Sequence, residues 1–295
     1  MEVFVLSMDK MLPTISIIIP TYNSEKVIES CLKAAKNQNY PKNKFEVIVV
    51  DNYSKDRTVP IAKSLGAKVF LLSGVPSQGC AQRNLGAEKA ELEYVFFLDH
   101  DMEMSRNLLK NFAEKVVETN NKVDAWYVPE KIVGNGPLWT EIRTFERSFY
   151  NSTVIDAARI IKKEKFEMTE KYDMKLSFGP ADWDFDIQLK EMGCTFGIID
   201  ECVYHHEELV SLWKYLTKKT KYTDGSLIYQ EKWKKRSKKA YNGIVSKQYS
   251  AGYRLIGIFF ENGKWKKVAE GFHLYIAVVF IRLCVGIMYS LSKFR

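Results

Sequence analysis

The feature that most constrains this sequence is a regular alternation of short apolar runs with segments of helical periodicity. The apolar runs, each suited to a buried strand, are 15–19, 45–50, 68–72 and 94–98. Between them, apolar residues recur at helical spacing in segments such as 27–35 and 81–90. Strands that are apolar on both faces are typical of a parallel sheet covered by helices on each side. The sequence therefore predicts an α/β fold with a mostly parallel sheet and helices on both faces.

Polar residues follow three of these apolar runs. Thr21 and Asn23 come after the first run, Asp51 ends the second, and Asp99 and Asp101 come after the fourth. In open α/β sheets, ligands bind beyond the carboxyl ends of the strands. We therefore expect these side chains to meet at one edge of the sheet and to form a ligand site there.

The segment Asp99-His100-Asp101 carries the clearest chemical signal. Two carboxylates one residue apart at a strand end can both reach a hard cation, and Mg²⁺ or Mn²⁺ takes oxygen ligands and bridges phosphates. Two acids in an isolated loop are more often solvated, but here a buried strand precedes them and other polar strand ends accompany them. We expect Asp99 and Asp101 to hold a divalent metal ion.

Two further signals lie near strand and helix ends, and each has a structural alternative. Asp51 could accept a hydrogen bond from a nucleobase or a ribose hydroxyl, or it could form a turn with Asn52 and Ser54. Gly79 permits close approach of a ligand to the backbone, and Arg83 could bind phosphate from the helix that follows. The alternative for this second motif is a helix start with an exposed arginine.

The remaining candidate residues come later in the chain. Asp182 lies where a helix opens and could act as a general base toward an acceptor hydroxyl, with capping of the helix as the alternative. His205 and His206 are expected to follow a short strand, and one of them could complete a metal shell. A solvated pair is the alternative for these histidines.

Together, these motifs occur in a fixed order along the chain. They are Pro20-Thr21-Tyr22-Asn23, Val49-Val50-Asp51-Asn52-Tyr53-Ser54-Lys55-Asp56, Gly79 to Gly86 with Arg83-Asn84, Asp99-His100-Asp101 and Gly179-Pro180-Ala181-Asp182-Trp183-Asp184. This order resembles that of the family 2 glycosyltransferases with the GT-A fold, over roughly Thr14 to Glu207.

The resemblance implies an inverting, metal-assisted enzyme that transfers one sugar from a nucleoside-diphosphate sugar, with a UDP-sugar favoured. The acceptor would be a hydroxyl of a glycan or a lipid-linked saccharide, and Asp182 would be the catalytic base. Asp101, Asp99 and His205 would hold Mg²⁺ or Mn²⁺, with His205 preferred to His206. The donor-binding residues would be Pro20, Thr21, Asn23, Asp51, Gly79, Arg83, Asp99 and His100.

The sequence departs from the family pattern at three places. Position 181 is Ala where the family often has an acid before the base, and position 52 is Asn where it often has a second acid. The Gln-x-x-Arg-Trp motif of processive synthases is matched only loosely by Gln230 to Trp233, so we expect transfer of a single sugar.

The C-terminal part differs in character from the rest. The formal net charge is +8, and Lys and Arg crowd the aromatic segment from Lys214 to Lys239. The run Phe272–Leu291 is apolar except for a few residues such as Arg282, and it fits a membrane span, an interfacial helix or a helix packed on the catalytic domain. We expect membrane contact, at the cytoplasmic face, by a peripheral helix or a single C-terminal span.

These observations define an expected domain organisation. A GT-A catalytic domain would cover 1–210, with its nucleotide-sugar half at about 14–102 and its acceptor half at 103–210. A helical extension, basic and apolar, would cover 211–295 and include the apolar helix 272–291. The five cysteines are scattered and contain no Cys-x-x-Cys pair, which argues against a disulfide framework and favours a reducing compartment.

Three alternative functions stay open at this stage. A nucleotidyltransferase would share the sheet and the carboxylates, but it should carry a glycine-rich basic loop where Pro20-Thr21-Tyr22-Asn23 stands. Ala181 leaves room for an inactive nucleotide-sugar-binding scaffold of the same fold. A polyprenyl-phosphate sugar synthase is a close variant of the main hypothesis. Nucleic acid is not an expected partner, because a donor site explains the strand-end residues, and no protein partner can be inferred.

Overall fold

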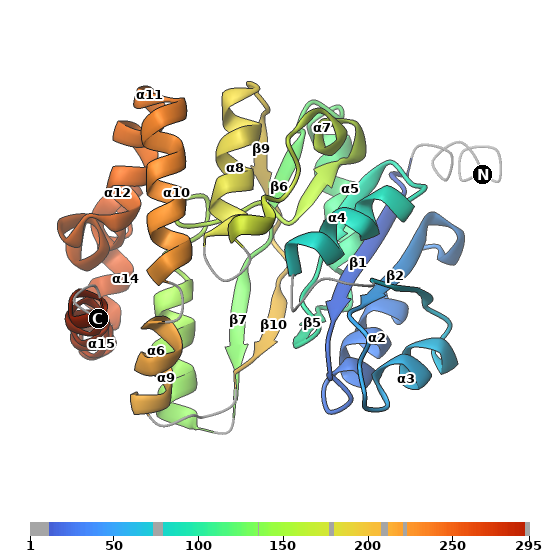
Figure 1. Cartoon of the computed structure of the whole chain (residues 1–295), viewed down its shortest axis with the longest axis horizontal. Coiled ribbons are helices and arrows are strands. Elements are labelled where there is room, and N and C mark those ends of the chain that lie inside the picture. Colours follow the sequence, from blue (N-terminus) through green and yellow to red (C-terminus); the bar gives the residue numbers. More distant parts are fainter. Residues whose placement is uncertain are drawn as a thin grey trace.

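The computed structural model describes residues 12–72, 79–134, 136–176, 180–207, 212–220 and 223–292. Within them, a seven-stranded sheet has the order β3-β2-β1-β4-β8-β6-β9 (Figure 1). Its strands are β1 (Ile15–Thr21), β2 (Phe45–Asp51), β3 (Lys68–Leu71), β4 (Tyr94–Phe97), β6 (Ala125–Tyr127), β8 (Ile160–Lys162) and β9 (Phe196–Ile198). All four apolar runs predicted to be strands therefore form neighbouring strands of one sheet.

The sheet is mostly parallel, as predicted. β1 pairs in parallel with both β2 and β4, and β2 pairs in parallel with β3. The exception is β8, which runs antiparallel to β4 and to β6. Because β1, β2 and β4 point the same way, their carboxyl ends bring Thr21, Asp51 and the segment after Phe97 to one edge.

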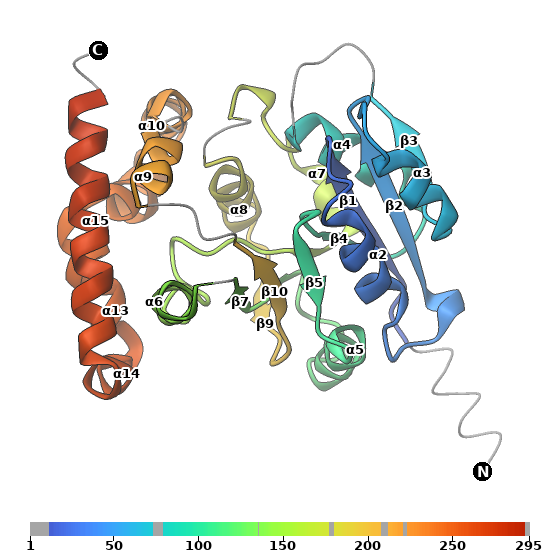
Figure 2. The ribbon, with the colours of Figure 1, turned by 90° about the horizontal axis from the view of Figure 1, so that it is seen from below.

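Helices cover both faces of this sheet (Figures 1 and 2). On one face, α2 (Ile28–Lys36), α3 (Thr58–Ser64) and α5 (Leu108–Glu118) pack on alternate residues of β1, such as Ile17. On the other face, α4 (Gly79–Lys89), α7 (Lys163–Met168) and α8 (Ala181–Glu191) belong to the core that contains Ile18. Because successive side chains of β1 point to opposite faces of the sheet, this strand contributes to two hydrophobic cores.

A second, three-stranded sheet lies beside the first and has the order β5-β10-β7. It contains β5 (Met102–Met104), β7 (Glu130–Val133) and β10 (Val203–His206). His205 pairs with Met102 in the antiparallel register of β10 and β5. The two histidines are therefore the last residues of a strand and do not follow one as expected, and this register carries His205 to the position beside Asp101.

The C-terminal region is helical, as predicted. After α6 (Pro137–Arg147), the late helices are α9 (Leu212–Thr220), α10 (Thr223–Arg236), α11 (Lys238–Ala240), α12 (Ser246–Tyr249), α13 (Ile258–Phe260), α14 (Trp265–Glu270) and α15 (Phe272–Ser292). Helix α10 is fixed to α8, because Trp233 Nε1 donates a hydrogen bond of 2.8 Å to the buried Asp184. Lys232 Nζ donates to the other oxygen of the same carboxylate.

Helix α15 packs along the edge of the molecule against α6 and α9 (Figure 2). Among the described residues, we find no helix with both the length and the apolar character that a bilayer crossing requires. Arg282 faces the protein, where its Nε donates a hydrogen bond of 2.8 Å to the buried Glu146. Of the arrangements predicted as possible for residues 272–291, packing against α6 and α9 thus accounts for one face of the helix.

Candidate functional site

The carboxyl ends of β1 and β2 are joined by a hydrogen-bond network around Asp51. This carboxylate is fully buried and accepts hydrogen bonds from Thr21 Oγ1 at 2.8 Å and from the backbone N and the Oγ of Ser54 at 2.8 and 2.6 Å. Asp51 therefore forms the turn that was its structural alternative. Its hydrogen bond from Thr21 also joins the carboxyl end of β2 to that of β1.

Asn23 and His100 complete this end of the site. Asn23 adopts a positive φ of 47°, and its side-chain oxygen accepts a hydrogen bond from the backbone N of Lys55 at 2.8 Å. His100 Nδ1 lies 3.2 Å from the carbonyl oxygen of Pro20. The predicted donor residues that follow β1, β2 and β4 are thus brought together, as expected from the parallel topology.

Arg83 lies beside the first acid of the Asp99-His100-Asp101 segment. Gly79 begins α4, and Arg83, about one turn later, places its Nη2 2.6 Å from Asp99 Oδ1 and its guanidinium 5.4 Å above the ring of Tyr172. The arginine side chain is only 15% exposed, which contradicts the alternative of an exposed arginine. Burial alone would raise the pKa of Asp99, but the charges of Arg83 and Arg159 hold that pKa well below its usual range.

Asp182 lies in the first turn of α8, on the other side of Arg83. Its Oδ1 is 3.8 Å from Arg83 Nη1, and its side chain is 52% exposed. Pro180 is the N-cap residue and makes no capping hydrogen bond, and Asp182 lies within the first turn of the helix. Asp184, two residues later, is buried and bonded to α10, so the two acids of this motif have separate environments.

His205 lies between two carboxylates. Its Nε2 is 3.3 Å from Asp101 Oδ2 and its Nδ1 is 2.7 Å from Glu130 Oε1, whereas His206 Nε2 lies 2.9 Å from Glu103. Burial opposes protonation of the imidazole, but the hydrogen bonds to Asp101 and Glu130 raise the pKa of His205 to about 9. His205 is therefore the histidine that lies beside the predicted metal-binding segment.

The predicted metal ligands are only partly assembled. In the part of the chain that the structure describes, no three His, Cys, Asp or Glu side chains are grouped to hold a metal ion. Asp101 and His205 are adjacent, but Asp99 faces Arg83 and Arg159 instead. The Asp101–His205 pair still fits a divalent ion, because a carboxylate such as Glu130 behind a ligating imidazole is the usual way to fix its tautomer.

Glu130 and Arg159 belong to this charged cluster but were not among the predicted site residues. Arg159 bridges Asp99 and Glu130, with its Nη1 3.5 Å from the former and its Nη2 3.3 Å from the latter. Arg147 Nε also lies 3.4 Å from Glu130. Arg159 and Glu130 thus connect Asp182 to Asp101 through a continuous series of charged side chains. Glu130 follows an apolar run, as Asp99 does, so the signal that identified the other strand-end acids could have identified it.

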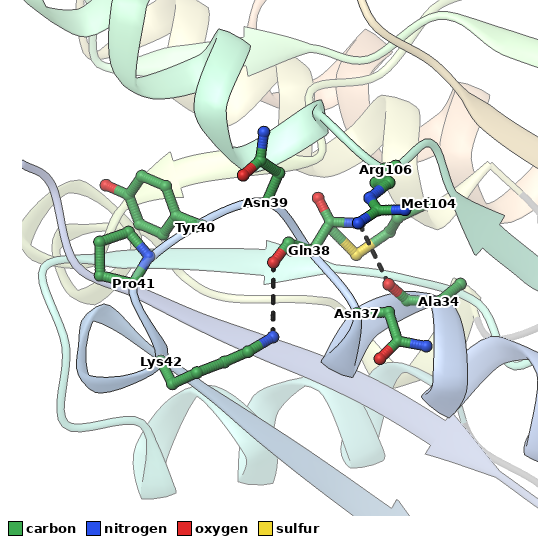
Figure 3. Close-up of a pocket in the computed structure, with 9 residues that line it drawn as sticks. All are labelled: Ala34, Asn37, Gln38, Asn39, Tyr40, Pro41, Lys42, Met104 and Arg106. Atoms are coloured by element: carbon green, nitrogen blue, oxygen red, sulfur yellow. Dashed lines mark hydrogen bonds between the residues drawn. The ribbon is translucent and has the colours of Figure 1, made fainter.

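Two cavities differ in their relation to these residues. A small one, of about 120 Å³, lies among Arg83, Asp182, Arg159 and Asp156. A wider depression, of about 900 Å³, lies at the C-terminal end of α2 and is shown in Figure 3. None of the predicted site residues lines the wider depression, and its Gln38 bonds to backbone carbonyl groups of the protein.

Comparison with known proteins identifies the family. The model of the family described as "Glycosyl transferase family 2" matches residues 16–172, which is more than half of the chain. The chain belongs to glycosyl transferase family 2. The match contains the ends of β1, β2 and β4, so family membership and the strand-end cluster concern the same part of the molecule.

Two relatives illustrate the likeness in sequence. A poly(ribitol-phosphate) beta-N-acetylglucosaminyltransferase, TarS of Staphylococcus aureus, is 39% identical over 115 residues, which are 37% of this chain and 20% of TarS. A Campylobacter jejuni GalNAc(5)-diNAcBac-PP-undecaprenol beta-1,3-glucosyltransferase is 30% identical over 112 residues, 36% of each chain. This family 2 chain thus spans about a fifth of the length of TarS and about a third of the length of the Campylobacter enzyme.

Two solved structures share the fold. TarS 1–349 in complex with UDP-GlcNAc has a TM-score of 0.57 at 19% identity, and the match covers 95% of this chain and 90% of the TarS chain. The Pyrobaculum calidifontis mannosyltransferase PcManGT, in complex with GDP-Man and Mn²⁺, has a TM-score of 0.58 at 17% identity and covers 96% and 87%. At such identities the likeness establishes the fold of this family 2 chain.

Proposed function

We propose that this protein is an inverting glycosyltransferase that transfers one sugar from a nucleoside-diphosphate sugar to an acceptor hydroxyl. The observation that carries the proposal is the 3.8 Å distance between Asp182 Oδ1 and Arg83 Nη1. It sets a half-exposed carboxylate, suited to a general base, beside the guanidinium expected at the donor diphosphate. Family membership supports the same reaction class.

The two side chains would act on opposite ends of the reaction. As the bond to the sugar breaks, negative charge grows on the leaving diphosphate, and Arg83, already oriented by Asp99, would stabilise it. Asp182 would take the proton of the acceptor hydroxyl while that oxygen attacks the anomeric carbon. General-base help of this kind contributes about 10²–10⁴-fold.

A divalent metal ion belongs to the proposed site. When bound, it would act as a Lewis acid that neutralises charge on the diphosphate. Asp101 and His205 would hold it, and Glu130 would keep the His205 ring oriented through the 2.7 Å contact to Nδ1. The Mn²⁺ named with the Pyrobaculum mannosyltransferase supports this part of the proposal.

The donor and acceptor classes are proposed from chemistry and from the relatives' names. A UDP-sugar is favoured because UDP-GlcNAc is the ligand named with TarS. A lipid-linked saccharide or a glycan is the proposed acceptor, because the named relatives use poly(ribitol phosphate) and an undecaprenol-linked saccharide. Residues 1–210 would form the catalytic domain, and 211–295 would hold it peripherally at a membrane.

The first test is thermal stabilisation by UDP, GDP, dTDP and CDP, each with Mn²⁺ and with EDTA. A ligand at 100 times its Kd stabilises the folded state by about 2.7 kcal/mol, so a specific nucleotide should raise the melting temperature measurably. A shift with one nucleotide that needs Mn²⁺ supports the proposal and names the donor class. The absence of a shift with every nucleotide would contradict the proposed donor site.

The second test uses Asp101→Ala. Because Asp101 is the carboxylate nearest to His205, its removal should abolish the metal-dependent part of donor binding. Calorimetry of UDP binding with and without Mn²⁺ measures this directly. Unchanged affinity and unchanged metal dependence in the variant would exclude Asp101 as a metal ligand.

A further inference from the structure

Helix α15 is apolar on two sides, and the residues that the structure describes cover only one of them. The covered side carries the buried residues Leu274, Val278 and Ile281 against the core that α6 and α13 share. A helix that is apolar all round is normally buried all round. The other side of α15 therefore needs a second apolar environment.

The uncovered side is a continuous stripe, defined here as the α15 stripe. Its side chains recur at intervals of three and four residues, are between 47% and 61% exposed, and are Phe272, Ile276, Phe280, Leu283 and Ile287. The two views agree that α15 lies at the edge of the molecule, with α6 and α9 on its inner side (Figures 1 and 2). A contiguous apolar stripe of this kind marks an interaction site.

The α15 stripe is extended by neighbouring aromatic side chains. The ring centroids of Phe260 and Phe272 lie 6.1 and 6.4 Å from that of Tyr275, so the three rings form one surface. Phe260 is 46% exposed, and Ile256, one helical turn earlier, is 58% exposed. The patch therefore widens beyond a single row of residues at the N-terminal end of α15.

The only arginine of α15 among the described residues is turned away from the stripe. Arg282 points inward, bonded to Glu146 and 3.2 Å from Tyr150 Oη, and its guanidinium lies 4.7 Å from the ring centroid of Phe259. The charge of Arg282 therefore does not lie on the apolar surface, because the guanidinium is buried in the protein and paired there. From Phe272 to Ile287 the exposed face carries no Asp, Glu, Lys or Arg.

Positive charge lies at one end of this apolar face. Lys266 and Lys267 are exposed in α14, next to Trp265, whose side chain is 54% exposed, and Glu270 is the exposed acid of the same helix. Lys267 Nζ lies 3.5 Å from the carbonyl oxygen of Ser148, so Lys266 is the lysine of α14 without a contact of this kind to the residues that the structure describes. Gly271, at the corner between the two helices, permits close packing on Phe145 of α6, because a Cβ there would lie 2.6 Å from that ring. Lysines beside an exposed tryptophan and an apolar helix face match the order of charge, interface and hydrocarbon in an anionic bilayer.

We propose that the α15 stripe, with Phe260, Trp265, Lys266 and Lys267, is a docking surface for an anionic lipid bilayer, on which α15 lies flat. The proposal deepens the proposed function, since a transferase that uses a lipid-linked acceptor works at that surface. It commits to lipid as the occupant, because the lysines complement anionic headgroups and would repel those of a second copy in a parallel arrangement.

The test is flotation of the full chain with vesicles of equal parts phosphatidylcholine and phosphatidylglycerol, and with vesicles of phosphatidylcholine alone. We expect the wild type to float with the mixed vesicles and less with phosphatidylcholine. Ile276→Glu with Phe280→Glu should lower partitioning at least about tenfold, because both charges enter the apolar layer. Lys266→Glu with Lys267→Glu should remove the preference for the mixed vesicles.

The matched control is Val117→Glu with Met168→Glu, which places two glutamates at apolar positions of similar exposure in α5 and α7. This control should float as the wild type does. Equal flotation of the α15 variant and the wild type would overturn the proposal, as would absence of wild-type flotation. A dimer in solution that the α15 variant dissociates, with flotation unchanged, would assign the stripe to a second copy instead.

Nucleotide-dependent thermal stabilisation of the same variants separates this inference from the proposed function. All variants should keep the wild-type shift, because the stripe lies outside the donor site. Loss of the shift in every protein, with flotation as expected, would reject the proposed function and leave the bilayer surface in place.

Discussion

The Nδ1 atom of His205 lies 2.7 Å from a carboxylate oxygen of Glu130, which leaves Nε2 directed at Asp101. The two partners come from separate strands, since Glu130 begins β7 and His205 lies in β10, which pairs with β7 in parallel. An imidazole held in this orientation presents Nε2 to a cation once the Nε2 proton is lost, because a histidine that binds a metal must be neutral. Burial opposes the charge of Glu130, but Arg147, Arg159 and His205 hold the pKa of this acid well below its usual range.

Glu130→Gln should weaken binding of Mn²⁺. The substitution keeps the shape of the side chain but removes the charge that orients His205, and loss of such a partner typically lowers metal affinity about 10–100-fold. Calorimetric titration of Mn²⁺ in the presence of UDP measures the effect. The matched control is Glu103→Gln, which alters the partner of His206 and should leave Mn²⁺ affinity unchanged. Equal losses in both variants would contradict the role assigned to Glu130.

Asp182→Asn should retain donor binding and lose transfer. The amide preserves the size of the side chain beside Arg83 but cannot take a proton, so we expect kcat to fall about 10²–10⁴-fold at an unchanged Kd for the nucleotide. Transfer from a radiolabelled donor gives kcat, and calorimetry gives the Kd. Glu164→Gln, in the first turn of α7, is the control for loss of an acid near a helix start. Undiminished transfer by Asp182→Asn would remove this residue as the base.

Asp156 should make stability fall as pH rises. Burial, and less strongly the nearby Asp186, raise the pKa of Asp156 to about 7, although backbone N–H groups of Ser152 and Ala157 and the charge of Arg159 oppose this. In the unfolded chain the group titrates near 3.8. Between these values the folded state binds more protons than the unfolded state, so the free energy of unfolding decreases with pH by up to about 1.4 kcal/mol per unit.

Asp156→Asn should therefore flatten this part of the pH profile and stabilise the protein most at pH 7 and above. Urea unfolding between pH 4.5 and pH 8 measures the free energy of unfolding for the wild type and the variant. Asp124→Asn is a control of opposite sign, because hydrogen bonds from Thr195 and Lys162 lower the pKa of Asp124 despite its partial burial. If the Asp156→Asn variant kept the pH slope of the wild type, another group would be responsible for that slope.

The local sequence was sufficient to predict strands β1 to β4. The run around Ile17 is apolar at nearly every position, and such a run has few alternatives to a buried parallel strand. Strand β8 escaped prediction because it has three residues and owes its conformation to β4 and β6, which pair with it from other parts of the chain. No local period can indicate a strand that tertiary pairing creates.

The same distinction applies to the site. The acids at the strand ends were predicted, because the topology gathers strand ends at one edge. The choice between His205 and His206 depends on the register of β10 against β5, since a slip of one residue would exchange the two faces. The bridge from Arg159 to Asp99 joins residues about sixty positions apart, and sequence spacing carries no signal for it.

The ion pair between Arg282 and Glu146 should stabilise the contact of α15 with α6. Glu146 is buried between the guanidinium groups of Arg143 and Arg282, and these charges outweigh the effect of burial and hold the pKa of Glu146 well below its usual range. Removing a single partner of a buried ion pair costs about 3–5 kcal/mol, because the remaining charge stays buried. Glu146→Gln should therefore reduce the free energy of unfolding by that amount.

Arg282→Met should cost less than Glu146→Gln, because Glu146 keeps Arg143 and Tyr150 while the methionine keeps apolar contact with Phe259. Urea denaturation followed by circular dichroism gives the free energy of unfolding of each variant. Glu231→Gln, which alters an exposed pair on α10, should leave stability unchanged within error. If Glu146→Gln were as stable as this control, the buried pair would contribute nothing, and apolar packing would suffice to hold α15 on α6.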